Sequence, residues 1–146
     1  MLTVKPKTKE ELKQIIKEAI MTQGNKANLN FIDVSLITNM TSLFNGSYFI
    51  GNISKWDVSN VEDMSYMFFD SQFNGDISDW DVSNVKSMNS MFYNCDFNGD
   101  ISKWDGSTEK DMTNMFYKSP LEDRYGKNGE NLKSDVTESY SRRYRR

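Results

Sequence analysis

Apolar and polar positions recur with a period of 24 residues through the middle of the chain. In the clearest copy, residues 73–92, fixed positions hold a phenylalanine, an isoleucine, a Trp-Asp-Val triplet, a further valine and two methionines, with phenylalanine after the second. Residues 49–68 and 97–116 repeat most of this order, and residues 29–44 carry a weaker copy. A fixed period of roughly 20 to 50 residues is typical of solenoids, whose units bury a shared core by stacking. The pattern therefore predicts a repeat fold.

Within each copy, the Trp-Asp-Val triplet predicts a short strand whose outer residues face the core and whose aspartate faces solvent. The run 62–69 places Met64, Met67 and Phe68 at helical spacing and predicts a short helix, capped by Ser59 or Asn60. Asn-Gly pairs at 74–75 and 98–99 predict the turns that return the chain. The predicted fold class is an α/β solenoid, a leucine-rich-repeat-like stack of about four 24-residue coils, each a short parallel strand plus a short helix.

Large apolar side chains recur once per copy at the predicted inward positions. Trp56, Trp80 and Trp104 form one such series, and methionine and phenylalanine form others. We expect them to be core, with a hydrogen-bond partner for each indole NH, rather than an aromatic platform for a ligand.

A helix is predicted before the repeats. Thr8 followed by Glu11 forms a capping box, and Gly24 marks the end. Between them, one stripe of the helix is apolar, which suits a cap on the end of a repeat stack. The apolar stripe consists of Leu12, Ile15, Ile16, Ala19 and Ile20. We therefore predict a single domain, with a helical cap at 1–27, repeats at 28–119 and a polar C-terminal cap or tail at 120–146.

The last copy departs from the pattern. Gly106 and Glu109 occupy the positions of Val82 and Val85, so two inward positions become small or charged, as in a last coil that lacks a neighbour. The residues beyond are polar. A thinly striped closing helix is predicted from the spacing of Leu132, Val136 and Tyr140.

The composition limits the classes of function that the sequence favours. The chain has 146 residues, a net charge of -3, one cysteine and no histidine, so it lacks the usual general base and the commonest metal ligand. This favours a protein that is not an enzyme and needs no cofactor. Cys95 takes the place of serines in other copies and is expected to be a small structural residue. A polar N-terminus and the lack of a long apolar run predict a cytosolic chain or a mature form without its leader, which leaves localisation open.

An aspartate occupies the middle of every predicted strand. On stacked strands these carboxylates lie about 4.8 Å apart and repel by about 1 kcal/mol per pair even at the dielectric of bulk water. Three explanations are open: local caps that accept backbone NH groups two residues on, a surface that recognises a basic partner, or a bound cation. The predicted partner-binding residues are Asp33, Asp57, Asp81 and Asp105.

Charge is unevenly divided. From Lys118 onward there are eight basic and five acidic residues, a net of +3, which leaves -6 on the rest of the chain. The end of the chain, Arg142 to Arg146 with Tyr140 before it, mixes aromatic and basic residues. It is either a solvated terminus or an electrostatic anchor for an acidic partner, RNA or an anionic surface.

The block at residues 74–94 closely resembles the repeat of BspA-like leucine-rich-repeat surface proteins, also known as the mycoplasma lipoprotein repeat of unknown function. The tryptophan, aspartate, valine and Met-Phe positions carry the likeness, which covers residues 29–119, and residues 7–12 are also similar to what precedes such repeats. The resemblance implies a bacterial, mycoplasmal or mobile-element origin and a non-catalytic protein-protein interaction module of surface or adhesin type. The alternative is an intracellular, phage- or mobile-element-encoded inhibitor whose acidic face binds a basic nucleic-acid-binding surface.

Overall fold

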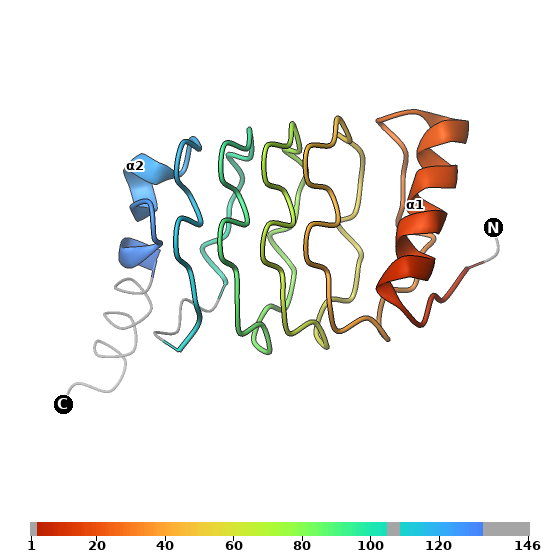
Figure 1. The fold of residues 1–146 in the computed structure, drawn as a ribbon, viewed down its shortest axis with the longest axis horizontal. Helices are drawn as coiled ribbons and strands as arrows, with labels where there is room; N and C mark the ends of the chain where they lie inside the picture. Colours follow the sequence, from red (N-terminus) through yellow and green to blue (C-terminus); the bar gives the residue numbers. More distant parts are fainter. Residues whose placement is uncertain (1–2, 105–108, 133–146) are drawn as a thin grey trace.

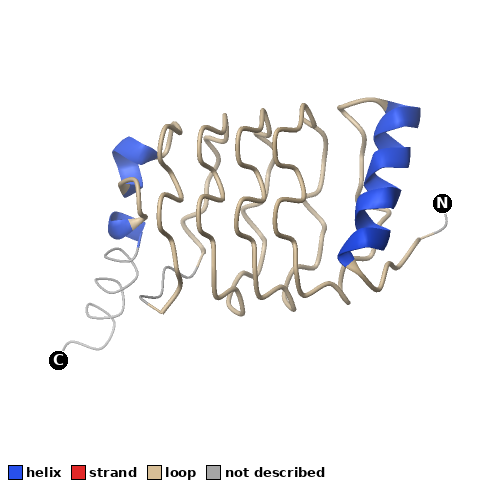
Figure 2. Cartoon of the chain, viewed as in Figure 1, coloured by secondary structure: helices blue, strands red, loops and turns tan. Residues whose placement is uncertain are grey.

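The computed structural model describes residues 3–104 and 109–132. Its body lies between a long helix, α1 (Lys9–Gln23), at one end and a short helix, α2 (Glu122–Tyr125), at the other (Figure 1). Between these helices, residues 29–52, 53–76, 77–100 and the described part of 101–119 run side by side; each of these segments is called a layer below. Figure 2 shows the layers as loops and turns.

The predicted α/β leucine-rich-repeat solenoid is wrong. The described residues contain no strand and no sheet, and the layers contain no helix. Neighbouring layers are joined instead by isolated parallel bridges, such as Asp63 with Ser87. The 24-residue recurrence is still visible in space, because this bridge recurs along the series Asn39, Asp63, Ser87 and Asp111.

The Trp-Asp-Val triplet is not a strand because its backbone bends through turns. The NH of Trp56 donates to the carbonyl of Ile53 at 3.2 Å, and the NH of Val61 donates to that of Val58 at 2.9 Å. Backbone groups bonded within such turns cannot pair with a neighbouring strand. The predicted alternation is nevertheless confirmed, since Trp56 and Val58 are buried and Asp57 is exposed.

The predicted helix at 62–69 is also wrong. Tyr66 and Asp70 have φ angles of 58° and 55°, in the left-handed region that a right-handed helix excludes. The NH groups of Met64, Tyr66 and Phe68 donate to carbonyls of the next layer at 2.9 Å instead of four residues back. Positive φ angles recur every 24 residues in two series. Tyr66 belongs to the series that also contains Ser42, Ser90 and Asn114, and Asp70 belongs to the series that also contains Gly46, Asn94 and Lys118.

The Asn-Gly pairs do not form the predicted turns either. Gly75 lies under the ring of Phe73, so a Cβ atom there would come within 2.8 Å of the ring. Gly99 has the same relation to Phe97, at 2.7 Å. The turn lies further on, where the NH of Trp80 donates to the carbonyl of Ile77. These glycines therefore allow close approach of a ring and do not supply a positive φ angle.

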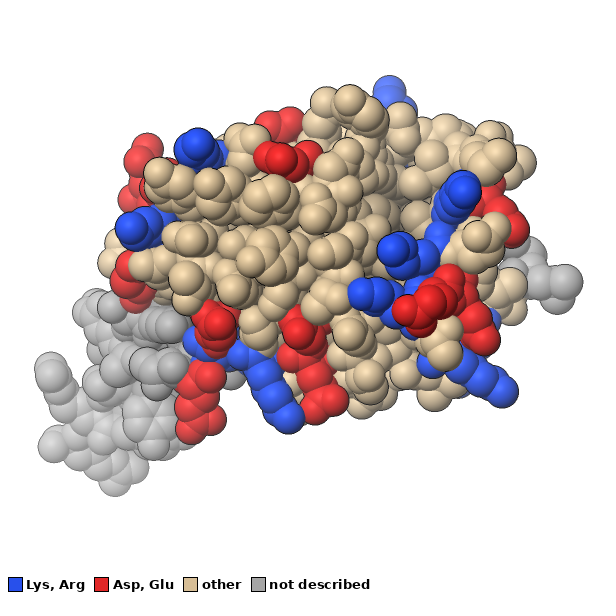
Figure 3. Space-filling view, viewed as in Figure 1, with Lys and Arg blue, Asp and Glu red and all other residues tan. Residues whose placement is uncertain are grey.

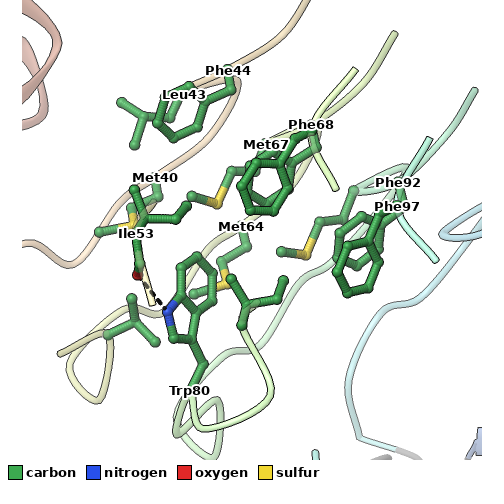
Figure 4. Packing of buried hydrophobic residues seen from close by; sticks show 14 of the residues in the cluster. Met40, Leu43, Phe44, Ile53, Met64, Met67, Phe68, Trp80, Phe92 and Phe97 are labelled. Atoms are coloured by element: carbon green, nitrogen blue, oxygen red, sulfur yellow. Dashed lines mark hydrogen bonds between the residues drawn. The ribbon is translucent and has the colours of Figure 1, made fainter. Parts of the chain in front are cut away.

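Aromatic rings stack through the interior from layer to layer. Ring centroids are 5.6 Å apart from Phe44 to Phe68 and again from Phe68 to Phe92, a series visible in Figure 4. Trp80 lies 6.5 Å from Trp56 and 6.4 Å from Trp104, with nearly parallel planes. Each indole NH donates to a backbone carbonyl of the preceding layer, as that of Trp80 does to Ile53 at 3.2 Å. The prediction that these residues form the core is confirmed.

The predicted N-terminal helix is confirmed as α1. The Oγ1 atom of Thr8 accepts the NH of Glu11 at 3.1 Å, and Gly24, with φ at 83°, ends the helix. The second half of the capping box differs from the prediction, because the Glu11 carboxylate accepts the NH of Lys7. Leu12, Ile16 and Ala19 face the core of the first layer.

At the C-terminal end of the stack, the charged side chain inside the last layer is that of Lys110, which the comparison of the repeats did not predict. Glu109 is exposed, whereas Lys110 is buried and donates from Nζ to the carbonyls of Val82 and Val85 at 2.9 and 2.7 Å. The prediction that Glu109 points inward is therefore wrong. Gly106 lies outside the described residues.

The chain after the last layer folds back onto it. Tyr125 of α2 is buried with its ring 5.5 Å from that of Phe116, and the NH of Phe116 donates to the carbonyl of Lys127 at 3.0 Å. Leu132 is buried as well. The other two residues of the predicted closing helix, Val136 and Tyr140, lie outside the described residues.

Replacing Trp80 with alanine should lower the free energy of unfolding by about 3–5 kcal/mol, because it leaves a cavity between two stacked indoles and the Ile53 carbonyl without its donor. Urea unfolding followed by circular dichroism measures this. Tyr48→Ala is the control, since Tyr48 is 66% exposed and its loss should change stability by less than about 0.5 kcal/mol. Equal effects of the two substitutions would contradict the stacked core.

Candidate partner-binding face

Three of the four predicted site aspartates lie at corners where the layers bend. Asp33, Asp57 and Asp81 each use Oδ1 to accept the backbone NH of the serine two residues on, at 3.0, 3.1 and 3.0 Å. Asp57 also accepts the hydroxyl of Ser59 at 2.6 Å. The local cap proposed from sequence is thus present. Asp105, the fourth predicted site residue, lies outside the described residues.

At other corners the same side-chain turn forms with asparagine in some layers and with aspartate in others. Asn28 and Asn52 accept the NH two residues on through Oδ1, at 3.0 and 2.9 Å, as Asp76 and Asp100 do at 2.9 Å in later layers. Asn39 does so at 2.8 Å, where Asp63 and Asp111 stand further along the chain. The turn therefore needs an acceptor oxygen and not a carboxylate.

One corner series differs in keeping its charge. Every described member of the series of Asp33, Asp57 and Asp81 is an aspartate, whereas the other two series mix aspartate with asparagine or serine. Asp57 and Asp81 are exposed, and Asp33 is partly covered, with Lys5 Nζ 3.8 Å from its carboxylate. Of the three series, this is the one that holds a carboxylate in every described layer.

Hydrogen bonding favours the ionised form of Asp33, Asp76 and Asp81. The hydroxyl and then the backbone NH of Ser83 lower the pKa of Asp81 below its ordinary value. Ser35 lowers the pKa of Asp33 in the same way, and Ser78 that of Asp76. The donors stabilise the charged form, so the corners stay negative in mildly acidic solution.

Lysines are interleaved with these aspartates. Lys103 pairs with Asp79 at 3.2 Å, one layer away, and Lys55 lowers the pKa of Asp76 through its charge. We call the surface formed by residues 28–33, 52–57, 76–81 and 100–103 the aspartate face. Figure 3 shows Asp, Glu and Lys side chains intermixed along the lower edge of the layers, whereas the middle of that view carries few charges. The aspartate face is therefore acidic but mixed in sign.

A partly exposed aromatic series was missed in the sequence analysis. The rings of Phe69 and Tyr93 stack at 4.8 Å, and that of Tyr117 follows 5.3 Å from Tyr93. Tyr66, 40% exposed, leans on Phe69. The available signal was an aromatic residue directly after the Met-Phe pair in three copies, where the first copy has Asn45.

A polar hollow lies beside the aspartate series. Its volume is about 540 Å³, and its lining includes asparagine side chains that bond to backbone carbonyls of a neighbouring layer, together with an ion pair. The Nδ2 atom of Asn60 donates to the Ser35 carbonyl at 2.8 Å, and Lys86 pairs with Glu62 at 3.0 Å. These interactions join neighbouring layers, and they use the polar groups that line the hollow. Ser59 and Asn60 therefore serve this corner instead of the predicted helix cap.

No group of three or more cysteine, histidine, aspartate or glutamate residues in the described chain is placed to hold a metal ion. Cys95 is buried, its Sγ lies 3.5 Å from the Phe73 carbonyl, and burial raises the pKa of the thiol to about 12. This agrees with the structural role predicted for it. Among residues 3–104 and 109–132, no helix has the length and apolar character to cross a membrane.

Comparison with protein families identifies one match, described as Mycoplasma protein of unknown function, DUF285, over residues 10–126. The chain belongs to this family. The matched region of this DUF285 protein includes most of α1, all the layers and α2. Neither the curated proteins nor the solved structures gave a match. The resemblance stated from sequence is thus supported at the level of the mycoplasma family.

Asp81→Asn should leave the free energy of unfolding within about 0.5 kcal/mol of the original, because asparagine supplies the same acceptor oxygen as at other corners. Asp81→Ala should lower it by about 1 kcal/mol, since the Ser83 NH loses its partner. Urea unfolding at neutral pH separates the two. An asparagine variant as unstable as the alanine variant would show that the charge itself is structural.

Stability should fall in acid. Because hydrogen bonds lower the carboxyl pKa values of Asp33, Asp76, Asp81 and Asp100 in the folded chain, their contribution is complete above the unfolded value of about 4 and is lost as the pH drops through the lower folded values. Melting temperatures between pH 2 and 5 measure this loss. The double variant Asp76→Asn/Asp81→Asn should show a shallower decline, and an unchanged decline would contradict the assignment.

Proposed function

We propose that this DUF285 protein is a non-catalytic protein-binding module that uses its aspartate face to hold a partner with basic groups. The observation that carries the proposal is the unbroken series of Asp33, Asp57 and Asp81 at corners where the chain elsewhere uses asparagine. Like charges on successive layers repel one another, and a basic partner surface would offset that repulsion.

The corner geometry supports this use. In the Ser59 and Ser83 turns only Oδ1 of each aspartate accepts the local bonds, and these bonds fix the direction of the carboxylate. Side chains already ordered before binding lose little conformational freedom on contact with a partner. The layers present them in a row, which suits a partner with several lysines or arginines.

The mixed charge of the aspartate face favours a protein partner over the role of a nucleic-acid mimic. Lys103 neutralises Asp79, and Lys55 lies close enough to Asp76 to lower its pKa. A mimic of a phosphate backbone gains from an unbroken negative surface, whereas complementary patches of both signs give specificity between proteins. The intracellular inhibitor is therefore the second candidate, supported by the acidic series alone.

The finer family resemblance agrees with the first candidate. The Trp-Asp-Val and Met-Phe repeats resemble those of BspA-like surface proteins, for which adhesion and protein binding are the expected roles. On this basis we propose a bacterial surface setting in which the aspartate face meets a basic protein surface. The aromatic series of Phe69, Tyr93 and Tyr117 would lie outside this contact.

The test compares capture by the immobilised full chain with capture by Asp57→Asn/Asp81→Asn, which removes two charges and keeps both turns. Bacterial lysate, intact cells and purified matrix proteins are applied at low and high salt, and bound proteins are identified by mass spectrometry. We expect proteins that bind the original chain in low salt, are released by high salt and are lost from the double variant.

The matched control is Asp63→Asn/Asp111→Asn, which makes the same charge change at corners where the chain also accepts asparagine. It should retain the captured proteins. Equal retention by both double variants would rule out the aspartate face as the binding surface. If DNA or RNA competes with the chain for the captured protein, the result would favour the inhibitor candidate over the protein-binding module.

A further inference from the structure

An apolar hollow of about 290 Å³ opens between α1 and the first layer. Ile16 and Ile20 of the helix form one wall, and Leu43 and Phe44 of the layer form the other. Met21, 77% exposed, lies at its edge. This hollow is separate from the aspartate face, so its use is independent of the function proposed above.

The hollow exists because a helix covers the first layer less completely than another layer would. Leu43 occupies the place of Met67, Met91 and Met115, which are 0% exposed, yet it remains 8% exposed. Phe44 stacks on Phe68 of the next layer and lines the hollow together with Ile16 and Ile20 of α1. The space is therefore the position that apolar side chains of a preceding layer would fill, and an unbranched hydrocarbon chain suits it.

A row of lysines follows the seam between α1 and the first layer. Lys9, Lys13 and Lys17 are spaced four residues apart, and Lys9 Nζ donates to the carbonyl and hydroxyl of Thr41 at 3.1 and 2.7 Å, which places the row against the layer. Lys13 and Lys17 line the hollow. Figure 3 shows several basic side chains gathered at this end of the molecule.

Lys13 and Lys17 form no ion pair with the described part of the chain. No described carboxylate lies within 4.0 Å of the ammonium of Lys13 or Lys17. Like charges four residues apart destabilise a helix, so the row costs stability where it stands. An anionic group at the mouth of the hollow would remove this repulsion.

We propose that the hollow binds a free, medium-chain fatty acid, with the hydrocarbon chain against Ile20, Leu43 and Phe44 and the carboxylate between Lys13 and Lys17. The apolar walls bury the methylene groups and the two ammonium groups select the negative head. The ligand completes the packing of the first layer and should stabilise the fold by binding only the native chain.

The test is titration of the full chain with sodium decanoate below its micelle concentration, followed by calorimetry and by the shift in melting temperature. We expect saturable binding of one decanoate per chain and a rise in melting temperature. Lys13→Gln/Lys17→Gln should weaken binding about tenfold by removing both charges from the mouth. Ile20→Trp should abolish binding by filling the hollow.

The control is Lys26→Gln/Lys127→Gln, which changes the net charge equally at lysines outside the hollow and should bind decanoate as the original chain does. Absence of saturable binding, or equal loss in the two lysine variants, would overturn the proposal. If decyltrimethylammonium binds as tightly as decanoate, the charge of the head group does not affect binding, and the role proposed for Lys13 and Lys17 is wrong. Binding to phosphatidylglycerol vesicles without binding of decanoate would overturn a free fatty acid in favour of a membrane surface.

Discussion

The division of backbone NH groups between turns and neighbouring layers is the constraint on which the structure depends. In the run from Met64 to Ser71, one NH closes a local turn and the next reaches the following layer, in alternation. Each backbone donor thereby finds a partner without a helix or a strand. The arrangement works only if the next layer presents its carbonyls at the same height, and this requires the strict 24-residue spacing.

The aromatic core follows from the same spacing. When equivalent residues lie directly over one another, their side chains must stack, and flat rings do so with little wasted volume. The series from Phe44 to Phe116 and from Trp56 to Trp104 therefore fill the interior, and the indole NH groups add bonds between layers. The corners outside need only a small side chain with an acceptor oxygen, so aspartate, asparagine and serine can exchange there.

The ends of the stack are where the regular pattern is modified. At the N-terminal end, α1 replaces a layer with a helix and leaves the apolar hollow beside Leu43. At the other end, Lys110 donates to the Ser83 carbonyl at 3.3 Å, and the equivalent carbonyls of Ser35 and Ser59 are bound by the amides of Asn60 and Asn84 in earlier layers. The two ends thus solve the same problem, an uncovered layer, with different chemistry.

By itself the sequence determined the period, most of the inward residues and the helix α1, and it offered the local caps at Asp57 and Asp81 as one of three explanations, because these features depend on spacing and on bonds within a few residues. It could not determine the backbone between them. Methionine and phenylalanine at 64, 67 and 68 have the spacing of a helix face, and only the φ angles of Tyr66 and Asp70 show that turns bury them instead. Likewise, Lys110 rather than Glu109 enters the core because carbonyls 25 to 28 residues away attract its ammonium. Tertiary structure decided these points, because hydrogen bonds between layers outweigh weak local preferences for helix or strand.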